Sequence, residues 1–169
     1  MHMLHLLRHA KSSWKKEVED RERPLNRRGR EAARRVGQSL PAAVGGLDLI
    51  LCSSARRTRE TLELIVAEFA VRPRSVVEDE LYEASKDKLM SRLRRLPEDI
   101  GNVLLIGHNP GLHELAMAIA DTNTVLSSGK FPTAARASFR VPEPWPAFGR
   151  SRCELVDYVT AGSLRSDED

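Results

Sequence analysis

The sequence predicts a single α/β domain, a three-layer sandwich in which a mostly parallel central sheet has helices on both faces and antiparallel edge pairing near the C-terminus. Apolar runs of strand length alternate with segments of helical periodicity, which is typical of parallel sheets. The chain has 169 residues, the size of one domain, and contains no internal repeat. We expect residues 1–162 to form that domain and residues 163–169 to be a polar tail.

In the N-terminal half, apolar runs at residues 2–7 and 47–52 predict two buried strands. A helix of about 14 residues is expected from Arg27, because Asn26 is a favourable N-cap and apolar residues follow at helical spacing. A second helix is expected after the serines at residues 53–54, which we interpret as its cap. Its apolar face is formed by Leu62, Ile65, Val66 and Phe69.

In the C-terminal half, residues 75–77 predict a weak strand and residues 103–106 a clear one. The helix between them carries Leu89, Leu93 and Leu96. A break at residues 107–111 precedes a helix that carries Leu112, Leu115, Ala116 and Ile119. Residues 137–141 and 153–160 predict two further strands around a Pro-rich turn at residues 142–146. These strands are expected to complete the sheet at an edge, and the turn has no further predicted role.

The composition excludes several classes of protein. No apolar run approaches ~20 residues, so no membrane span is expected. The first eight residues have neither the basic segment nor the cleavage site of a signal peptide. Cys52 and Cys153 lie far apart without C-x-x-C spacing, which disfavours a disulfide framework or a zinc site. We therefore expect a cytoplasmic protein without a metal.

Polar residues collect where three predicted strands end. The first strand ends in Arg8-His9, the second in residues 53–57 (SSARR), and the fourth in residues 107–109 (GHN). The carboxyl ends of parallel strands form the ligand crevice of an open α/β sheet, beside the N-termini of helices. If these strands are neighbours, two histidines and several arginines meet at a site that favours anions.

Four blocks in this order resemble the histidine phosphatase (phosphoglycerate-mutase-like) superfamily, and most closely its small SixA-type phosphohistidine phosphatases. The first block is LLRHAKS at residues 6–12, and the second is RPLNxxG at residues 23–29. SSARRTRET at residues 53–61 is similar to the family's Ser-Pro-x-x-Arg-Ala-x-Gln-Thr block, and residues 107–108 resemble the last block. The ordered blocks extend over residues 4–116, which makes the resemblance specific.

The resemblance implies a metal-independent phosphatase without a cofactor. His9 is expected to be the nucleophile, forming a phosphohistidine enzyme that water then hydrolyses. Arg8 and Arg57 are expected to clamp the phosphoryl oxygens, since phosphoryl transfer depends mainly on positioning and neutralised charge. Arg23 is expected to be a third phosphate-binding arginine. His108 is expected to bind the phosphoryl group opposite His9 and stabilise charge during transfer.

Two assignments in the site are uncertain from the sequence. Counting from both ends of the 53–61 block selects Arg57, rather than Arg56, as the phosphate ligand. The resemblance implies a carboxylic acid after the third strand, where Glu83 lies. The competing carboxylates are Asp79, Glu80 and Asp87. Ser54, Thr58 and Glu60 replace the proline, alanine and glutamine of the family block, with small local effects expected.

The chain length indicates an open pocket. Only about 30 residues separate the second helix from the strand at 103–106, and a strand and a helix use most of them. Larger relatives carry lid-forming insertions there, so a shallow pocket with residues 14–16 (WKK) on its rim is expected. Such a pocket suits phosphohistidine in a signalling protein, for example a phosphotransfer domain. The alternative substrate is a small phosphomonoester.

The rival from another class is a basic nucleic-acid-binding module. It is suggested by 21 arginines among 27 basic residues, at a net charge of +3. Acidic residues interrupt the basic segments and only 5% of residues are aromatic, so neither a nucleic acid nor a membrane is an expected partner. A phosphate-binding pseudoenzyme is disfavoured because both histidines are present. A monomer is expected.

Other histidines and arginines have structural interpretations. His5 is expected to pack in or beside the first strand. His113 follows His108 by five residues, which is poor spacing for two metal ligands on one helix face. The remaining helical arginines are expected to form solvated surface: Arg27, Arg28, Arg30, Arg34, Arg35, Arg92, Arg94 and Arg95.

Overall fold

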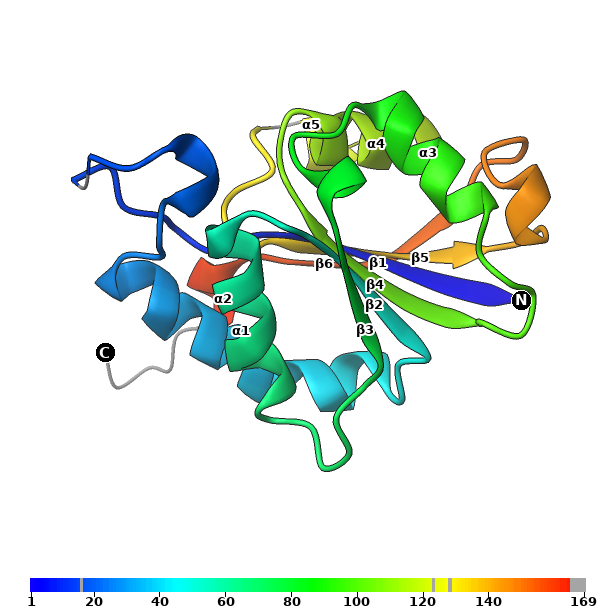
Figure 1. The fold of residues 1–169 in the computed structure, drawn as a ribbon. Coiled ribbons are helices and arrows are strands. Elements are labelled where there is room, and N and C mark those ends of the chain that lie inside the picture. The colour runs from blue at the N-terminus through cyan, green and yellow to red at the C-terminus, as the bar shows by residue number, and fades with distance from the viewer. Residues whose placement is uncertain (16, 123, 128, 165–169) are drawn as a thin grey trace.

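The computed structural model describes residues 1–169 except residues 16, 123, 128 and 165–169. The strands are β1 (His2–Arg8), β2 (Leu49–Ser53), β3 (Ser75–Glu78), β4 (Asn102–Gly107), β5 (Arg136–Val141) and β6 (Glu154–Val159). They form one sheet in the order β3-β2-β4-β1-β5-β6 (Figure 1). The first four strands of that order pair in parallel, whereas β5 and β6 pair antiparallel at the edge. The predicted fold class is confirmed.

Helices cover both faces of the sheet. They are α1 (Arg27–Val44), α2 (Arg56–Val66), α3 (Lys86–Arg94), α4 (Gly111–Ile119) and α5 (Thr124–Ser127). Short 3-10 helices are η1 (Asp20–Glu22), η2 (Asp79–Leu81), η3 (Trp145–Ala147) and η4 (Ala161–Leu164). Helices α1 and α2 lie on one face, and α3, α4 and α5 on the other (Figure 1). The sequence did not predict the short helix α5.

The central strands are buried on both sides. Along β4, Val103 and Leu105 join the core cluster under α3 and α4, whereas Leu104 and Ile106 join the cluster under α1 and α2. Successive side chains of a strand point to opposite faces, so a strand with helices on both sides needs an uninterrupted apolar run. This burial explains why β2 and β4 were recognisable as continuous apolar runs, whereas the run of β1 is interrupted by the buried His5.

The N-cap of α1 forms a side-chain hydrogen bond, whereas that of α2 does not. Asn26 caps α1 as predicted, and its side chain accepts a hydrogen bond from Gly29 N at 2.8 Å. The helix has 18 residues, about one turn more than expected. The predicted cap at residues 53–54 is wrong, because α2 has Ala55 as its N-cap with no side-chain hydrogen bond. Ser53 is instead the last, buried residue of β2, and its hydroxyl accepts from the backbone N of Ala55 at 3.3 Å rather than from an N–H of the helix itself.

Gly29 and Gly111, in the first turns of α1 and α4, allow loops to pack closely against these helices. A Cβ at Gly29 would lie 2.0 Å from the carbonyl oxygen of Lys11, and one at Gly111 would lie 2.0 Å from that of Ala84. Neither approach leaves room for a side chain. The loop after β1 is therefore held on the first turn of α1, and the loop after η2 on the first turn of α4.

The C-terminal segment completes the core. The Pro-rich turn places Trp145 in the interior, where its ring stacks on His2 with centroids 4.6 Å apart and its Nε1 donates to Ile100 O at 2.7 Å. Helix η4 takes up residues 163–164 of the expected tail, and residues 165–169 lie outside the described part. Within the described residues, no helix is long and apolar enough to cross a bilayer.

Candidate active site

A pocket of about 350 Å³ lies at the carboxyl ends of β1, β2 and β4. These strands are neighbours in the sheet, and Arg8 is paired in register with Gly107. Adjacent parallel strands bring their following loops together, as expected for a crevice in an α/β sheet. All six residues proposed from the sequence line this pocket: Arg8, His9, Arg23, Arg57, Glu83 and His108.

His9 is buried directly after β1, with 6% of its surface exposed. Its Nδ1 lies 2.7 Å from the carbonyl oxygen of Ala10. A carbonyl can only accept, so Nδ1 carries the proton and Nε2 keeps its lone pair. Burial lowers the pKa of His9 to about 4, aided by the positive charges of Arg57, Arg8 and Arg23 and opposed by the Ala10 hydrogen bond. His9 is therefore a neutral ring with a fixed tautomer at neutral pH.

His108 lies opposite His9. The two ring centroids are 5.2 Å apart, and the planes are tilted by 54°. Nε2 of His108 is 2.7 Å from the hydroxyl of Ser53, the residue misassigned as a helix cap. Burial, with the nearby His9 and Arg57, lowers the pKa of His108 to about 3. Both rings are therefore neutral over the range in which a free histidine titrates.

Arg57, the arginine that the count along the 53–61 block favoured, is one of the residues that line the pocket. Arg57 is 2% exposed and donates from Nη2 to Glu83 Oε1 at 2.7 Å and to Asp20 Oδ2 at 3.2 Å. Arg56 does not line the pocket, and its Nε instead pairs with Glu60 Oε2 at 3.2 Å. One residue along a helix rotates a side chain by about 100°, which separates the two arginines.

Arg23 enters the pocket from the loop after η1. It is 7% exposed, and its Nη1 donates to the hydroxyl of Ser12 at 2.7 Å. Its guanidinium lies 3.5 Å from the centroid of the Trp14 ring. Trp14 lines the pocket and is 78% exposed, so it lies on the rim as predicted. Lys15 is exposed and does not line the pocket, and residue 16 lies outside the described part.

Asp20 is a residue of the site that the sequence analysis missed. Its carboxylate accepts from Arg23 Nε at 3.1 Å, from Arg57 Nη2, and from the hydroxyl of Tyr82 in a short contact. The Tyr82 hydrogen bond and the two arginines lower the pKa of Asp20 to about 2. The i,i+3 spacing of Asp20 and Arg23 was the available signal, because a 3-10 turn places such residues together.

The four carboxylates proposed as candidate acids occupy different places. Glu83 lines the pocket, with Oε1 3.8 Å from Nδ1 of His108, and has a backbone φ of +50°. The other three do not line it. Asp79 pairs with Arg21, Glu80 with Arg92 and Arg95, and Asp87 with Lys86. The geometry therefore leaves Glu83 as the candidate among the four.

Several buried nitrogens of pocket-lining residues have no hydrogen-bond partner within the described chain. They are Nε of Arg8, Nε of Arg57 and Nδ1 of His108. Buried polar groups in proteins nearly always find a partner, and an unpaired one costs about 1–3 kcal/mol. Together with the fork of Arg23, these groups form a cationic, hydrogen-bond-donating pocket beside a neutral nucleophilic nitrogen. A phosphoryl group suits such a set, because arginine forks match its oxygens.

The remaining histidines have structural roles, as predicted. His5 is buried in β1, with Nδ1 2.7 Å from the Ser138 hydroxyl and Nε2 2.7 Å from Asn102 Oδ1. His113 lies on α4, with Nε2 2.8 Å from Leu126 O, and does not line the pocket.

Comparison with known sequences places these observations in a family. The family model described as histidine phosphatase superfamily (branch 1) matches residues 4–95. An uncharacterised protein of Mycobacterium tuberculosis is 32% identical over 145 residues, covering 82% of this chain and 89% of the relative. An uncharacterised chloroplastic protein of Arabidopsis thaliana is 32% identical over 134 residues, covering 73% of this chain and 61% of the relative.

Two solved structures share the fold over nearly the whole chain. A candidate phosphohistidine phosphatase SixA from Nakamurella multipartitia is 25% identical, with a TM-score of 0.84, and the match covers 94% of this chain and 95% of that one. A candidate phosphohistidine phosphatase SixA from Agrobacterium tumefaciens is 29% identical, with a TM-score of 0.81 and coverage of 94% and 97%.

Proposed function

Since this chain belongs to the histidine phosphatase superfamily, we propose that it is a phosphatase that uses His9 as its nucleophile and removes the phosphoryl group from phosphohistidine in a signalling protein. The observation that carries the proposal is the hydrogen bond from Nδ1 of His9 to the carbonyl oxygen of Ala10. It leaves Nε2 unprotonated in a pocket lined by Arg8, Arg23 and Arg57.

The reaction proceeds in two displacements. Nε2 of His9 attacks phosphorus, and the P–N bond to the substrate imidazole breaks as that ring accepts a proton. Water then attacks the phosphorus of phosphorylated His9, the Nε2–P bond breaks, and inorganic phosphate leaves. We assign both proton transfers to Glu83, which would donate a proton to the leaving ring and take one from the attacking water. Its carboxylate is within 3.8 Å of Nδ1 of His108.

The other side chains stabilise charge on the transferring group. Nε of Arg8 and Nε of Arg57 are free to donate to phosphoryl oxygens. With the Ser53 hydroxyl donating to Nε2 of His108, the proton of that ring is on Nδ1, which then donates as well. These groups supply the positive charge that a metal ion supplies in other phosphatases, so we propose hydrolysis without a metal.

A protein substrate is supported by the open rim and by the structural neighbours. Trp14 is 78% exposed at the edge of the pocket, so the rim is open to solvent at this residue. Two structural neighbours, at 25% and 29% identity, are candidate phosphohistidine phosphatases. We propose that the protein acts as a monomer, and we propose a cytoplasmic location because the substrate is a signalling protein.

The test is a steady-state comparison of substrates. We expect kcat/KM for a phosphohistidine protein to exceed that for p-nitrophenyl phosphate and sugar phosphates by about a hundredfold or more. His9→Ala is expected to abolish turnover of all of them, whereas the control His113→Ala, outside the pocket, retains it. Turnover of the small esters alone would reject phosphohistidine as the substrate and favour the phosphomonoester alternative.

A further inference from the structure

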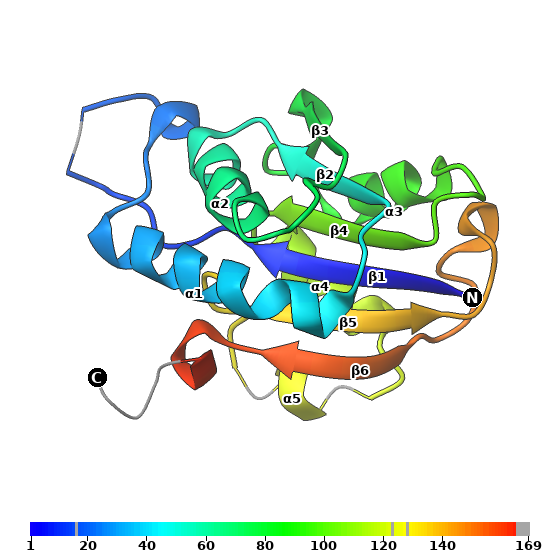
Figure 2. The ribbon, with the colours of Figure 1, turned by 90° about the horizontal axis from the view of Figure 1, so that it is seen from below.

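A second hollow of about 820 Å³ adjoins the catalytic pocket. It shares Lys11 and Thr133 with that pocket and continues along the first half of α1 towards Gly162 in η4. Helices α1 and η4 are in contact, and Figure 2 shows η4 beside α1 at the end of the sheet where β1 ends. The hollow is therefore an extension of the active-site opening along one helix.

The wall of this hollow carries a row of cations. Arg28 and Arg35 are seven residues apart, so they lie on one face of α1, about 10 Å apart along its axis. Lys11 is fixed at the catalytic end of the row, because its carbonyl oxygen accepts from Asn26 N at 3.0 Å, just before the helix begins. The row thus leads away from the phosphoryl site.

These cations are not neutralised by the protein. Lys11, Arg28 and Arg35 form no ion pair with any described residue, and Nε of Arg35 is buried without a partner in the same part of the chain. Glu31, an acidic side chain on the wall, pairs instead with the exposed Arg27 at 3.3 Å. The wall is therefore available to an anionic ligand.

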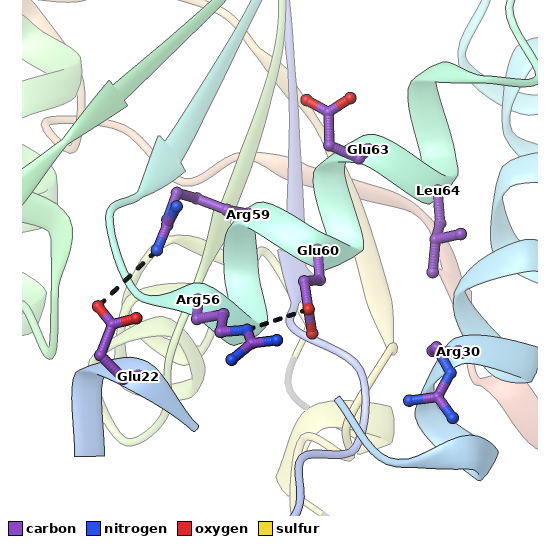
Figure 3. A pocket seen from close by; sticks show the side chains of 7 residues that line it. All are labelled: Glu22, Arg30, Arg56, Arg59, Glu60, Glu63 and Leu64. Carbon is purple, nitrogen blue, oxygen red and sulfur yellow. Dashed lines mark hydrogen bonds and ion pairs between the residues drawn. The ribbon is translucent and has the colours of Figure 1, made fainter. Parts of the chain in front are cut away.

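A third hollow differs from this one in how its charged side chains are paired. It is lined by Glu22, Arg30, Arg56, Arg59, Glu60, Glu63 and Leu64 (Figure 3). There Arg56 pairs with Glu60 at 3.2 Å and Arg59 with Glu22 at 3.9 Å, whereas Arg30 donates to the carbonyl oxygen of Leu25 at 3.0 Å. Two of the three arginines of that hollow are thus ion-paired within the described chain, whereas none of Lys11, Arg28 and Arg35 is.

The length of the row specifies the ligand. A single phosphoryl group held in the catalytic pocket would not extend along about 10 Å of helix, whereas about three extended residues would. None of the described residues that line this hollow is aromatic, so it offers no surface on which a nucleobase could stack. We propose that the hollow of Lys11, Arg28 and Arg35 binds an acidic segment next to the phosphohistidine of the protein substrate. This inference rests on the proposed function, because it specifies the substrate that reaches His9.

The experiment compares two phosphohistidine peptides that differ in flanking charge. One carries three glutamates on each side of the phosphohistidine, and the other carries glutamines. We expect the wild-type protein to favour the acidic peptide, and Arg28→Glu to lower kcat/KM for it about tenfold while changing that for p-nitrophenyl phosphate by less than about twofold. Arg34→Glu is the matched control, an exposed residue of the same helix outside the hollow with the same change in charge. Equal losses for Arg28→Glu and Arg34→Glu, or no acidic preference in the wild-type protein, would overturn the proposal.

A second measurement separates this proposal from the proposed function. Fluorescence anisotropy of the labelled glutamate peptide without phosphate reports binding to the hollow alone. Weaker binding to Arg28→Glu and Arg35→Gln at unchanged Tm supports the hollow, even if the wild-type protein hydrolyses no phosphohistidine and the proposed function fails. Unchanged binding contradicts the hollow even if phosphohistidine is hydrolysed. If neutralising Asp167, Glu168 and Asp169 raises the affinity more than tenfold, the chain's own acidic residues are the occupant and the proposal is wrong.

Discussion

Arg57 donates to Asp20 twice, from Nη1 to the backbone carbonyl oxygen at 2.8 Å and from Nη2 to the carboxylate at 3.2 Å. The same carboxylate accepts from Arg23 at 3.1 Å, so one aspartate holds two of the three arginines of the pocket. Asp20 is positioned by the turn η1 rather than by a strand end. We therefore expect Asp20 to be a positioning residue for the arginines that we propose bind phosphate, and this role gives the first prediction.

We expect Asp20→Asn to lower kcat about tenfold, because Arg23 and Arg57 lose a charged partner that fixes their forks. The inhibition constant of inorganic phosphate is not expected to rise, since the substitution also removes a negative charge beside the anion. Asp79→Asn, at an exposed residue that pairs with Arg21, is the control and should retain the wild-type kcat. If phosphate affinity and kcat fell together, Asp20 would support the fold of the pocket rather than the orientation of the Arg23 and Arg57 guanidinium groups.

Arg57→Ala is expected to lower kcat/KM by about a hundredfold or more, because the substitution removes a buried donor aimed at developing charge. Arg56→Ala should change it by less than about threefold, since Arg56 pairs with Glu60 outside the pocket. Steady-state kinetics of the two variants, with Tm measured for each, decides between them. A larger loss of kcat/KM in Arg56→Ala than in Arg57→Ala would show that the phosphate-binding arginine had been assigned one residue out of register.

The pH dependence follows from the neutral state of His9. Burial lowers its pKa to about 4, and only the neutral ring is nucleophilic, so the reactive form persists as pH falls from 8 to about 5 and is lost below that. A free histidine would lose it near pH 6.5. NMR titration of the His9 ring in the free protein measures this directly, without an acid-labile substrate. A midpoint near 6.5 would contradict the buried, cation-surrounded site.

Gly111→Ala is expected to lower Tm by about 5 °C and to reduce activity, because a Cβ there would lie 2.0 Å from Ala84 O and displace the loop that carries Glu83. Gly46→Ala is the control, since a Cβ at Gly46 meets no atom within 4 Å. Circular dichroism melting and kcat of both variants check the expectation. Equal Tm values for the two would show that α4 can shift without cost.

The sequence was sufficient for the parts of this protein that depend on local pattern. The strands β2 and β4 are buried on both faces, so their apolar runs were continuous, and β1 was recognisable despite the buried His5 within it. His9 and His108 follow the ends of β1 and β4. Asn26 was recognisable because an N-cap acts within one helical turn. The choice of Arg57 over Arg56 likewise depended on a local count of residues along the 53–61 block.

Other features depend on contacts between distant segments. The sequence analysis misassigned Ser53, because its partner His108 lies 55 residues away. Asp20 was missed because its contacts with Arg57 and Tyr82 require η1 to fold over the start of α2. Arg28 is exposed, as expected for a solvated helix face, but the hollow that it lines with Arg35 could not be predicted, since it exists only once η4 lies beside α1.

The proposal that Nε2 of His9 is the nucleophile is tested most directly by identifying the atom that carries the phosphoryl group in the phosphorylated enzyme. Rapid acid-free quenching of the protein with a ³²P-labelled phosphohistidine peptide, followed by alkaline digestion, separates the two phosphohistidine isomers. Because Nδ1 of His9 donates its proton to the carbonyl oxygen of Ala10 at 2.7 Å, we expect the label on Nε2 of His9, and no label in His9→Ala. Label on Nδ1, on another residue, or an absence of labelled enzyme during turnover would contradict it.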